Sequence, residues 1–503
     1  MSATQAKKKK QLLSQPPENT GGKTASSPPS PVGADPQDHK QAAVSGVVWS
    51  AVGLVLSQAL RLVGNIILSR ILFPSDFGVM ALVGIFIYGI EMFSDLGIWR
   101  SVAQNERGAE PTFLNTAYTI QAIRGVALWA IAAALAWPYA AYYDEPMLVP
   151  YICVSGIMSV LLGLQSPSLM VHRRQMSLAV LTKAFLGAQA VSLAVMLTWA
   201  AIHPSPWALV VGGIAEAAVI MLASHTWLSL YSPRFEWNAD ARRELIRFGK
   251  WIFLSSALTL VVSQSDRLAL GKLVSKEDLG QYSIALGLAS LVKVLAGQVI
   301  NNVLFPLMSR AQSDRERLLA MFLKARAVLL RACAGCCAVI VIGGPLFFDT
   351  LYDERYASLG YYVQWITLWV WCGIMTQGID HVWTALGNTR VAVVGGCVRT
   401  LGVPFAIIGF DIGGLPGLVC GFACADLLGQ AVLVAMLPGR RVAAFRQSGL
   451  YSLLGGGYVG LALAIIASQR STASHWSISL LIVALAIPPM LDAGLHTWRQ
   501  LRS

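Results

Sequence analysis

Charged side chains lie inside long apolar stretches of this sequence of 503 residues. Arg61, for example, stands in the apolar run that begins at Ser45. The other ionisable residues in such runs are Glu91, Asp95, Arg124, Lys183, Glu216, Asp266, Arg267, Lys293, Arg331, Asp380, His381, Arg399 and Asp426. A charge at the centre of a membrane-spanning helix costs roughly 2.5 kcal/mol or more, so these groups should face a bundle interior or a water-filled cavity. Because they come from both halves of the chain, they predict a central polar cavity.

The deep cations indicate what such a cavity would bind. Cations from several helices make a positive cavity, which favours an anionic group such as a phosphate or pyrophosphate. Arginine adds a planar fork that can hold two oxygens of that group. We therefore predict a substrate-binding set of cations: Arg61, Arg124, Arg267, Lys293 and Arg399. The alternative that stays open is a buried structural ion pair, such as Arg61 with Glu91.

The acids in the same runs are candidates for coupling to an ion or a proton: Glu91, Asp95, Glu216, Asp266 and Asp426. Glu91 and Asp95 stand at i and i+4 on one helix face, where two carboxylates can share a proton. Asp266 and Arg267 are neighbours, so their side chains point about 100 degrees apart on a helix. We expect one of these two to line the cavity and the other to pair locally.

Other residues in the apolar runs have a structural interpretation. Four charged residues lie near predicted helix ends, where they can reach the interface: Lys183, Arg331, Asp95 and Asp380. The eight cysteines fall inside predicted spans and should behave as small apolar residues. The run Cys333-Ala-Gly-Cys336-Cys337 has no second Cys or His pair at ligand spacing, so we expect no metal and no cofactor.

The elements that position these residues must be membrane-spanning helices. The chain is 55% hydrophobic and only 13% charged, with a mean hydropathy of +0.59, which excludes a soluble protein of this length. Continuous apolar runs of about 20 residues favour helices over membrane strands. We predict an all-α polytopic protein of about fourteen transmembrane helices, starting near residues 45, 79, 114, 148, 178, 207, 252, 282, 326, 359, 391, 415, 448 and 477.

An internal repeat divides these helices into two lobes. Residue pairs in the two halves match at a constant separation of 202 positions: Trp49 with Trp251, Leu56 with Leu258, Arg70 with Lys272, Asp76 with Asp278, and Gly78 with Gly280. Two similar lobes with a site between them are typical of transporters. We predict a disordered cytoplasmic tail (1–42), an N-lobe of helices one to six (43–230), a C-lobe of helices seven to twelve (231–437), and helices thirteen and fourteen with a short cytoplasmic C-terminus (438–503).

Orientation follows from the positions of lysine and arginine. If the tail is cytoplasmic, the loops on its side hold most of these cations, for instance Arg173, Arg174 and the 234–250 segment. The positive-inside rule then places both termini in the cytoplasm. The formal net charge of +12 is therefore a topology signal. Without a folded basic domain it gives no reason to expect nucleic acid as a partner.

Several motifs resemble one known family. They are LSRILFPSDFGVMAL at 68–82, FSDLG at 93–97, FLNTA at 113–117 with Arg124 downstream, DRLALGKLV at 266–274 and LGQYS at 279–283. Together they resemble the polysaccharide-transporter family, which contains the O-antigen and exopolysaccharide flippases of the multidrug, oligosaccharidyl-lipid and polysaccharide exporter superfamily. The resemblance covers the chain from about Ser45 to its end.

The resemblance implies a flippase and not an enzyme. The expected substrate is an oligosaccharide repeat unit on undecaprenyl pyrophosphate, moved across a bacterial inner membrane by alternating access. The expected partners are this lipid-linked oligosaccharide, membrane lipids, and a polysaccharide polymerase with a chain-length regulator.

Three alternatives remain open at this point. A multidrug-type exporter or a peptidoglycan-precursor exporter of the same superfamily would share the two-lobe design. A membrane polysaccharide polymerase or glycosyltransferase would need catalytic groups on a long outer loop, and every predicted outer loop is short. No Gly-rich phosphate loop followed by Lys and Ser or Thr is present, which argues against an ATP-driven pump.

Overall fold

A computed structural model of the chain describes residues 36–94, 97–175, 177–310, 314–386, 388–437, 444 and 447–449. Every regular element in this part of the chain is a helix, which confirms the all-α prediction. The chain divides after Gln41 into a short N-terminal unit and a compact main unit, Ala42–Ser503. Apart from the start of the first helix, the described residues belong to the main unit. The predicted tail lies outside the described residues up to residue 35.

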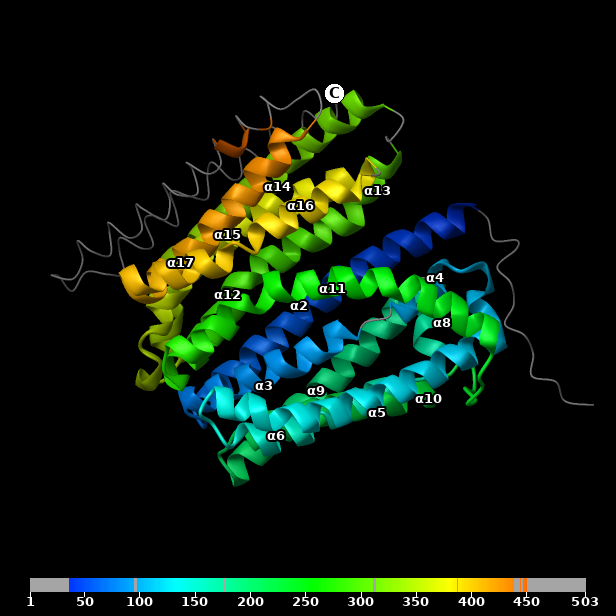
Figure 1. Ribbon diagram of the computed structural model, residues 1–503, viewed down its shortest axis with the longest axis horizontal. Coiled ribbons are helices and arrows are strands. Elements are labelled where there is room, and N and C mark those ends of the chain that lie inside the picture. Colours follow the sequence, from blue (N-terminus) through cyan, green and yellow to red (C-terminus); the bar gives the residue numbers. More distant parts are fainter. Residues whose placement is uncertain are drawn as a thin grey trace, which may run out of the picture. The chain divides into compact units, whose positions relative to one another are not determined.

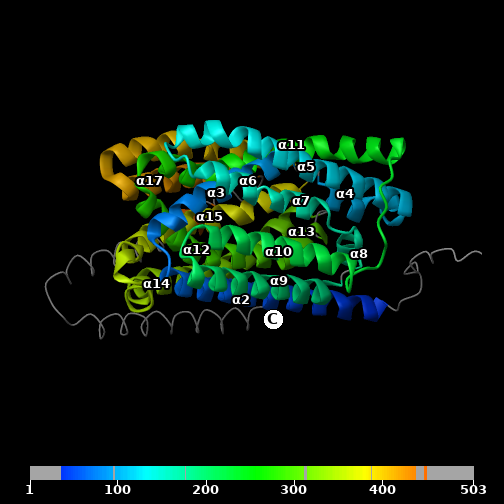
Figure 2. The same ribbon diagram turned by 90° about the horizontal axis from the view of Figure 1, so that it is seen from below.

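The N-lobe consists of six predicted spans, most of which are single long helices (Figure 1). Its main helices are α2 (Pro36–Ser69), α3 (Pro74–Phe93), α5 (Pro111–Tyr142), α6 (Leu148–Ser155), α7 (Ile157–Gly163), α9 (Leu178–Ile202) and α10 (Trp207–His225). Short elements join them: α4 (Ile98–Gln104), η1 (Glu106–Ala109) and α8 (Ser168–Arg174). Figure 2 shows α2 beside α9, where Gln189 Nε2 donates to the carbonyl of Ser57 at 2.9 Å.

The C-lobe repeats this plan. Its elements are α11 (Ala239–Leu273), α12 (Lys276–Val299), η2 (Ile300–Leu304), α13 (Phe305–Arg310), α14 (Arg315–Leu351), η3 (Glu354–Tyr356), α15 (Leu359–Ala385), α16 (Thr389–Arg399) and α17 (Gly402–Ala435). η2 is a π-helical turn, and Pro306 lies two residues after its end. Because proline has no N–H for the helical ladder, the turn keeps α12 and α13 on one continuous path.

Glycines fold α17 back on itself. Gly414 has a φ of +61°, a left-handed conformation that only glycine adopts without strain. Beyond this bend the two arms pack backbone to backbone, because a Cβ on Gly409 would collide with the carbonyl of Gly417. The eleventh predicted helix, which starts near residue 391, comprises α16 and the first arm, and the second arm is the twelfth predicted helix.

The described residues do not confirm the predicted number of spans. Eight described helices are long and apolar enough to cross a membrane, or nine if the bent pair Leu148–Gly163 and Ser168–Arg174 is one span. The helices predicted near residues 448 and 477 lie outside the described part of the chain, except for residues 448–449. A total of fourteen therefore stays a prediction.

The repeated turns bring the two lobes together. Asp76 accepts a hydrogen bond from the N–H of Phe73 at 2.9 Å, and Ser275 accepts one from the N–H of Asp278 at 3.1 Å. These caps start α3 and α12 directly after α2 and α11. α3 and α12 then pack closely against each other across the lobes. We call this end of the molecule, formed by residues 70–78 and 272–280, the turn end.

The equivalent glycines of the repeat touch at the turn end. A Cβ on Gly280 would collide with the carbonyl oxygen of Pro74, and a Cβ on Gly78 would collide with that of Lys276. Backbone therefore meets backbone at the crossing of α3 and α12. Only glycine at both positions permits this approach.

Two equivalent cations complete a reciprocal contact between the lobes. Arg70 at the end of α2 donates to the carbonyl of Leu351 at 2.9 Å. Lys272 at the end of α11 donates to the carbonyl of Tyr142 at 2.8 Å and to Asp144 at 2.7 Å. Each lobe thus uses the same repeat position to bind the end of the other lobe's third helix.

The ion pair at this contact resists mild acid. Hydrogen bonding and charge from Lys272 hold the pKa of Asp144 below its ordinary value. A lowered pKa means that the contact favours the ionised carboxyl, so it is complete at neutral pH. It is lost only as the pH falls through that lowered pKa.

Residues 226–238 connect the lobes at the opposite end, which we call the linker end. Asn115 on α5 holds this segment through three hydrogen bonds. Its Oδ1 accepts from the Tyr231 hydroxyl at 2.6 Å and from the Arg234 N–H at 2.9 Å, and its Nδ2 donates to Glu236 at 2.8 Å. The segment is therefore fixed to the N-lobe.

We expect Asn115→Ala to release this segment, because three hydrogen bonds of about 1 kcal/mol each are lost. Tryptic cleavage after Arg234, which is exposed, should become at least about tenfold faster in the purified protein. Thr198→Ala is the matched control, since the Thr198 hydroxyl bonds only within its own helix. Equal cleavage rates for Asn115→Ala and the unmodified protein would contradict this role.

Candidate functional site

A cavity of about 360 Å³ lies between the lobes, next to the turn end. The N-lobe contributes residues of α2 and α3, and the C-lobe contributes residues of α11 and α12. The lining side chains and backbone are those of Asn65, Phe77, Met80, Ala81, Gly84, Tyr88, Gln264, Arg267, Ser283 and Ile284. The two-lobe repeat predicts a site in this place.

Arg267 gives the cavity its charge. Its Nη1 makes a long contact of 3.4 Å with Gln264 Oε1, and its Nε has no hydrogen-bond partner among the described residues. The buried Oγ of Ser283 is likewise without a partner there. Unsatisfied donors beside a cation in a cavity provide hydrogen bonds for an anion.

Asp266 and Arg267 point in different directions, as their neighbouring positions predict. Asp266 is 1% exposed and accepts a hydrogen bond from the Tyr282 hydroxyl at 2.8 Å. It therefore joins α11 to α12 within the C-lobe. Its other oxygen, Oδ1, has no partner among the described residues. Arg267 is the member of the pair that lines the cavity.

The predicted charged residues of the N-lobe interact within that lobe. Arg124 donates to Ser94 Oγ at 2.9 Å and to the carbonyl of Glu91 at 3.0 Å, so it caps the C-terminal end of α3. The Glu91 carboxylate accepts a hydrogen bond from Ser159 at 3.1 Å. Asp95 lies outside the described residues, so its predicted pairing with Glu91 stays a prediction.

Arg61 on α2 is an electrostatic neighbour of Glu216 on α10. The sequence left open an ion pair between Arg61 and Glu91. In the structure the acid that interacts with Arg61 is Glu216 instead. Lys183, another predicted helix-end cation, lies 5.2 Å from the ring centre of Trp49 in a cation–π contact.

Two pairs of charges lie inside the C-lobe. Lys293 and Asp426 interact electrostatically, and Asp426, which is 8% exposed, also accepts a hydrogen bond from Trp369 Nε1 at 3.0 Å. Arg399 forms an ion pair of 3.0 Å with Asp380. In this conformation both predicted substrate cations, Lys293 and Arg399, have an acid beside them.

We expect Lys293→Met to destabilise the protein, because the buried Asp426 carboxylate loses its strongest cationic neighbour and keeps only the weaker interaction with Arg399. Complete loss of a buried partner costs about 3–5 kcal/mol, which is the upper bound here. Adding Asp426→Asn should restore most of the loss, since asparagine keeps an acceptor for Trp369. The melting temperature in detergent measures both effects. If the two substitutions lower it additively, the residues do not form a structural pair.

One buried cation escaped the sequence analysis. Arg326, near which the sequence predicts the start of the ninth helix, lies inside α14 and is 3% exposed. It donates to the carbonyl of Met375 at 2.9 Å and to Ser448 Oγ at 3.2 Å. The apolar run that follows it directly was the available signal, because it places Arg326 at the start of a span.

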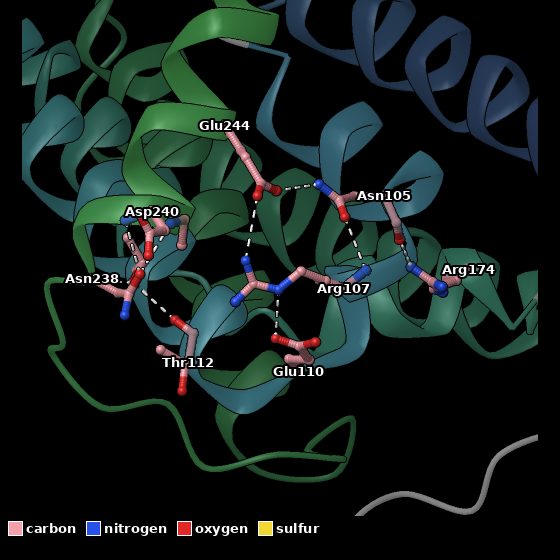
Figure 3. Close-up of polar contacts among 10 residues, drawn as sticks. Asn105, Arg107, Glu110, Thr112, Arg174, Asn238, Asp240 and Glu244 are labelled. Carbon is pink, nitrogen blue, oxygen red and sulfur yellow. Dashed lines mark hydrogen bonds and ion pairs between the residues drawn. The ribbon is translucent and has the colours of Figure 1, made fainter.

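A polar network ties α11 to the N-lobe at the linker end (Figure 3). Glu244 on α11 accepts hydrogen bonds from Asn105 Nδ2 at 2.8 Å and Arg107 Nη1 at 3.3 Å. Arg174 donates to the carbonyl of Asn105 at 2.7 Å. The start of α11 is therefore bound to the N-lobe, although the sequence assigned it to the C-lobe.

Comparison with known proteins identifies the family. Residues 67–359 match the family described as polysaccharide biosynthesis protein, which is more than half of the chain. The chain belongs to this family. The matched range contains all residues that line the cavity except Asn65, so the site between the lobes is part of the family's common region.

Individual relatives of this polysaccharide biosynthesis protein are distant. The lipopolysaccharide biosynthesis protein WzxC of Escherichia coli (strain K12) is 22% identical over 395 residues, which cover 77% of this chain and 79% of WzxC. The succinoglycan biosynthesis transport protein ExoT of Rhizobium meliloti (strain 1021) is 26% identical over 286 residues, 54% of each chain.

A solved structure shares the fold of this chain. The lipid II flippase MurJ, in an inward closed conformation, superposes with a TM-score of 0.68 and 10% identity. The superposition covers 91% of this chain and 100% of that one. It shows that this chain has the two-lobe helical fold found in a flippase.

Proposed function

We propose that this protein is a flippase for lipid-linked oligosaccharides in polysaccharide biosynthesis. The substrate would be a repeat unit on undecaprenyl pyrophosphate, destined for exopolysaccharide, capsule or O-antigen. The observation that carries the proposal is the cavity between the lobes, with Arg267 in it, in a chain of the polysaccharide biosynthesis protein family. The protein acts as a transporter and not as an enzyme.

The cavity suits the charged part of such a substrate. Arg267 offers its guanidinium to the pyrophosphate, and Ser283 and Asn65 offer shorter polar groups. Phe77 and Met80 supply an apolar wall. The predicted contributions of Arg61, Arg124, Lys293 and Arg399 remain proposals, and each would require the residue to leave its present partner.

Transport would follow alternating access between the two lobes. In this proposal the contacts at the turn end would close the cavity on that side, and their release would open it there. The acids Glu91, Asp95, Glu216, Asp266 and Asp426 are proposed to couple this motion to an ion or proton gradient. We place the protein in the bacterial inner membrane, with both termini in the cytoplasm.

A second group of functions shares the fold. A peptidoglycan-precursor flippase also carries a pyrophosphate-linked glycan, and a multidrug-type exporter would use the same two lobes. The relatives' names favour a role in polysaccharide biosynthesis. WzxC is described as a lipopolysaccharide biosynthesis protein, and ExoT as a succinoglycan biosynthesis transport protein. A polymerase and a chain-length regulator are the partners expected for such a flippase.

The test is glycan export in a strain that lacks the gene. Lipid-linked repeat units should accumulate on the cytoplasmic leaflet, and the intact gene should clear them. If repeat units still reach the outer leaflet and only fail to polymerise, the protein is a polymerase or glycosyltransferase instead. If the gene rescues a strain depleted of its peptidoglycan-precursor flippase, the result would support a peptidoglycan-precursor flippase instead.

A further inference from the structure

One side of the segment at the linker end is bound to α5. Asn115 holds Tyr231 and Glu236, as described above, and the N–H of Glu236 donates to Thr119 Oγ1 at 2.9 Å. The N–H of Asn238 donates to Thr116 Oγ1 at 3.2 Å. These hydrogen bonds fix which side chains point away from the protein.

Three aromatic side chains of the segment are exposed. Phe235 is 68% exposed, Trp237 is 54% exposed and Trp227 is 62% exposed. Such side chains bury large apolar areas when they are covered, so exposing three of them in one short segment is unfavourable in water. These side chains therefore need an apolar or interfacial environment.

The charged side chains of this region are likewise either bound or exposed. The acids Glu236 and Glu244 are turned toward Asn115, Asn105 and Arg107, and Figure 3 shows Glu244 in this position. Arg234 and Arg243 are exposed.

Two further residues stand at the start of α11. Arg242 lies 5.5 Å from the ring centre of Trp237. Asp240, also exposed, stands in the first turn of α11, where the helix dipole favours a carboxylate. The exposed side chains are thus aromatic with a cationic excess.

We infer that the aromatic and cationic side chains of this segment and of the start of α11, namely Trp227, Arg234, Phe235, Trp237, Arg242 and Arg243, bind the anionic headgroup layer of the bilayer. The segment follows α10, a candidate membrane span that ends at His225, so it leaves the membrane where headgroups lie. Tryptophan and arginine together are typical of such interfaces, and anionic lipids attract each exposed arginine. The inference does not depend on the transported substrate.

Binding of this segment to the bilayer would fix the position of the N-lobe relative to the membrane. Because Asn115 binds the segment to the N-lobe, a membrane-bound segment would hold the N-lobe at a constant depth. The C-lobe would then be the part that moves during transport.

Photocrosslinking of the full-length protein tests this inference. A benzophenone amino acid at Phe235 or Trp237, in variants that retain glycan export, should form adducts with lipids when native membranes are irradiated. The same probe at Tyr231, which faces α5, should react within the chain instead. Mass spectrometry of the purified protein identifies the adducts.

A second measurement addresses the charge. In nanodiscs of phosphatidylcholine and phosphatidylglycerol, adducts at Phe235 should favour phosphatidylglycerol, and Arg234→Gln with Arg243→Gln should reduce this preference several-fold. Adducts mainly with another protein would overturn the inference and indicate a protein partner. An absence of lipid adducts at both positions, or an unchanged lipid preference in the double variant, would also overturn it.

Discussion

Export of lipid-linked glycan should fall about ten- to hundredfold when Arg267 is replaced by alanine. A hydrogen bond to a charged group contributes about 1.5–3 kcal/mol, and about 1.4 kcal/mol corresponds to a factor of ten. Arg267 lines the cavity, and its Nη1 makes only a long contact with Gln264, so the terminal nitrogens can form these bonds with the substrate. The measurement is the clearance of repeat units from the cytoplasmic leaflet in the deletion strain.

Two further variants make this result specific. Arg267→Lys should retain part of the activity, because it keeps the charge but loses the planar fork. Arg315→Ala removes an exposed arginine at the start of α14 and should export normally. If Arg267→Ala is present in the membrane at normal levels and exports at the normal rate, the cavity is not the substrate's route.

Gly280→Ala should also abolish most export, by more than about tenfold, although it adds only one methyl group. The new Cβ would meet the backbone carbonyl of Pro74 and would lie 2.9 Å from the N–H nitrogen of Gly78. Backbone atoms cannot move aside as a flexible side chain can, so α3 and α12 would have to separate. Gly78→Ala should have the same effect through the carbonyl of Lys276.

The separation itself can be measured. Cysteines at Asp144 and Lys272, whose side chains are in contact, should be linked readily by a short bifunctional reagent in the parent protein. Gly280→Ala should lower the yield. Gly287→Ala is the control on the same helix, because no atom lies within 4 Å of its added Cβ and alanine favours helices. Equal yields in all three proteins would exclude a role for the glycine crossing in closure.

Much of the fold could be predicted from the sequence, because long apolar runs indicate membrane-spanning helices. The constant separation of Gly78 and Gly280 predicted two similar lobes, and these residues mark their contact. Neighbouring positions on a helix also predicted that Asp266 and Arg267 would point in different directions.

The pairing of charges could not be predicted in the same way. Arg61 lies near Glu216 and Lys293 near Asp426 because of how distant helices pack, and a single sequence contains no record of that packing. The start of α11 is a similar case. Its contacts with Asn105 and Arg107 depend on side chains from loops more than a hundred residues earlier in the chain.

Tolerance to substitution should be one-sided at the turn end. Several contacts between the lobes there run from a side chain to a backbone carbonyl: Arg70 to Leu351, Lys272 to Tyr142, Tyr143 to Leu268, and Tyr356 to Leu72. The accepting residue can change identity and still present its backbone carbonyl. The donating residue cannot, because its donor belongs to the side chain. At these contacts a saturation mutagenesis map should therefore show greater sensitivity at the donors Arg70, Lys272, Tyr143 and Tyr356 than at exposed accepting positions such as Tyr142 and Leu351, in addition to the sensitivity expected at Gly78 and Gly280.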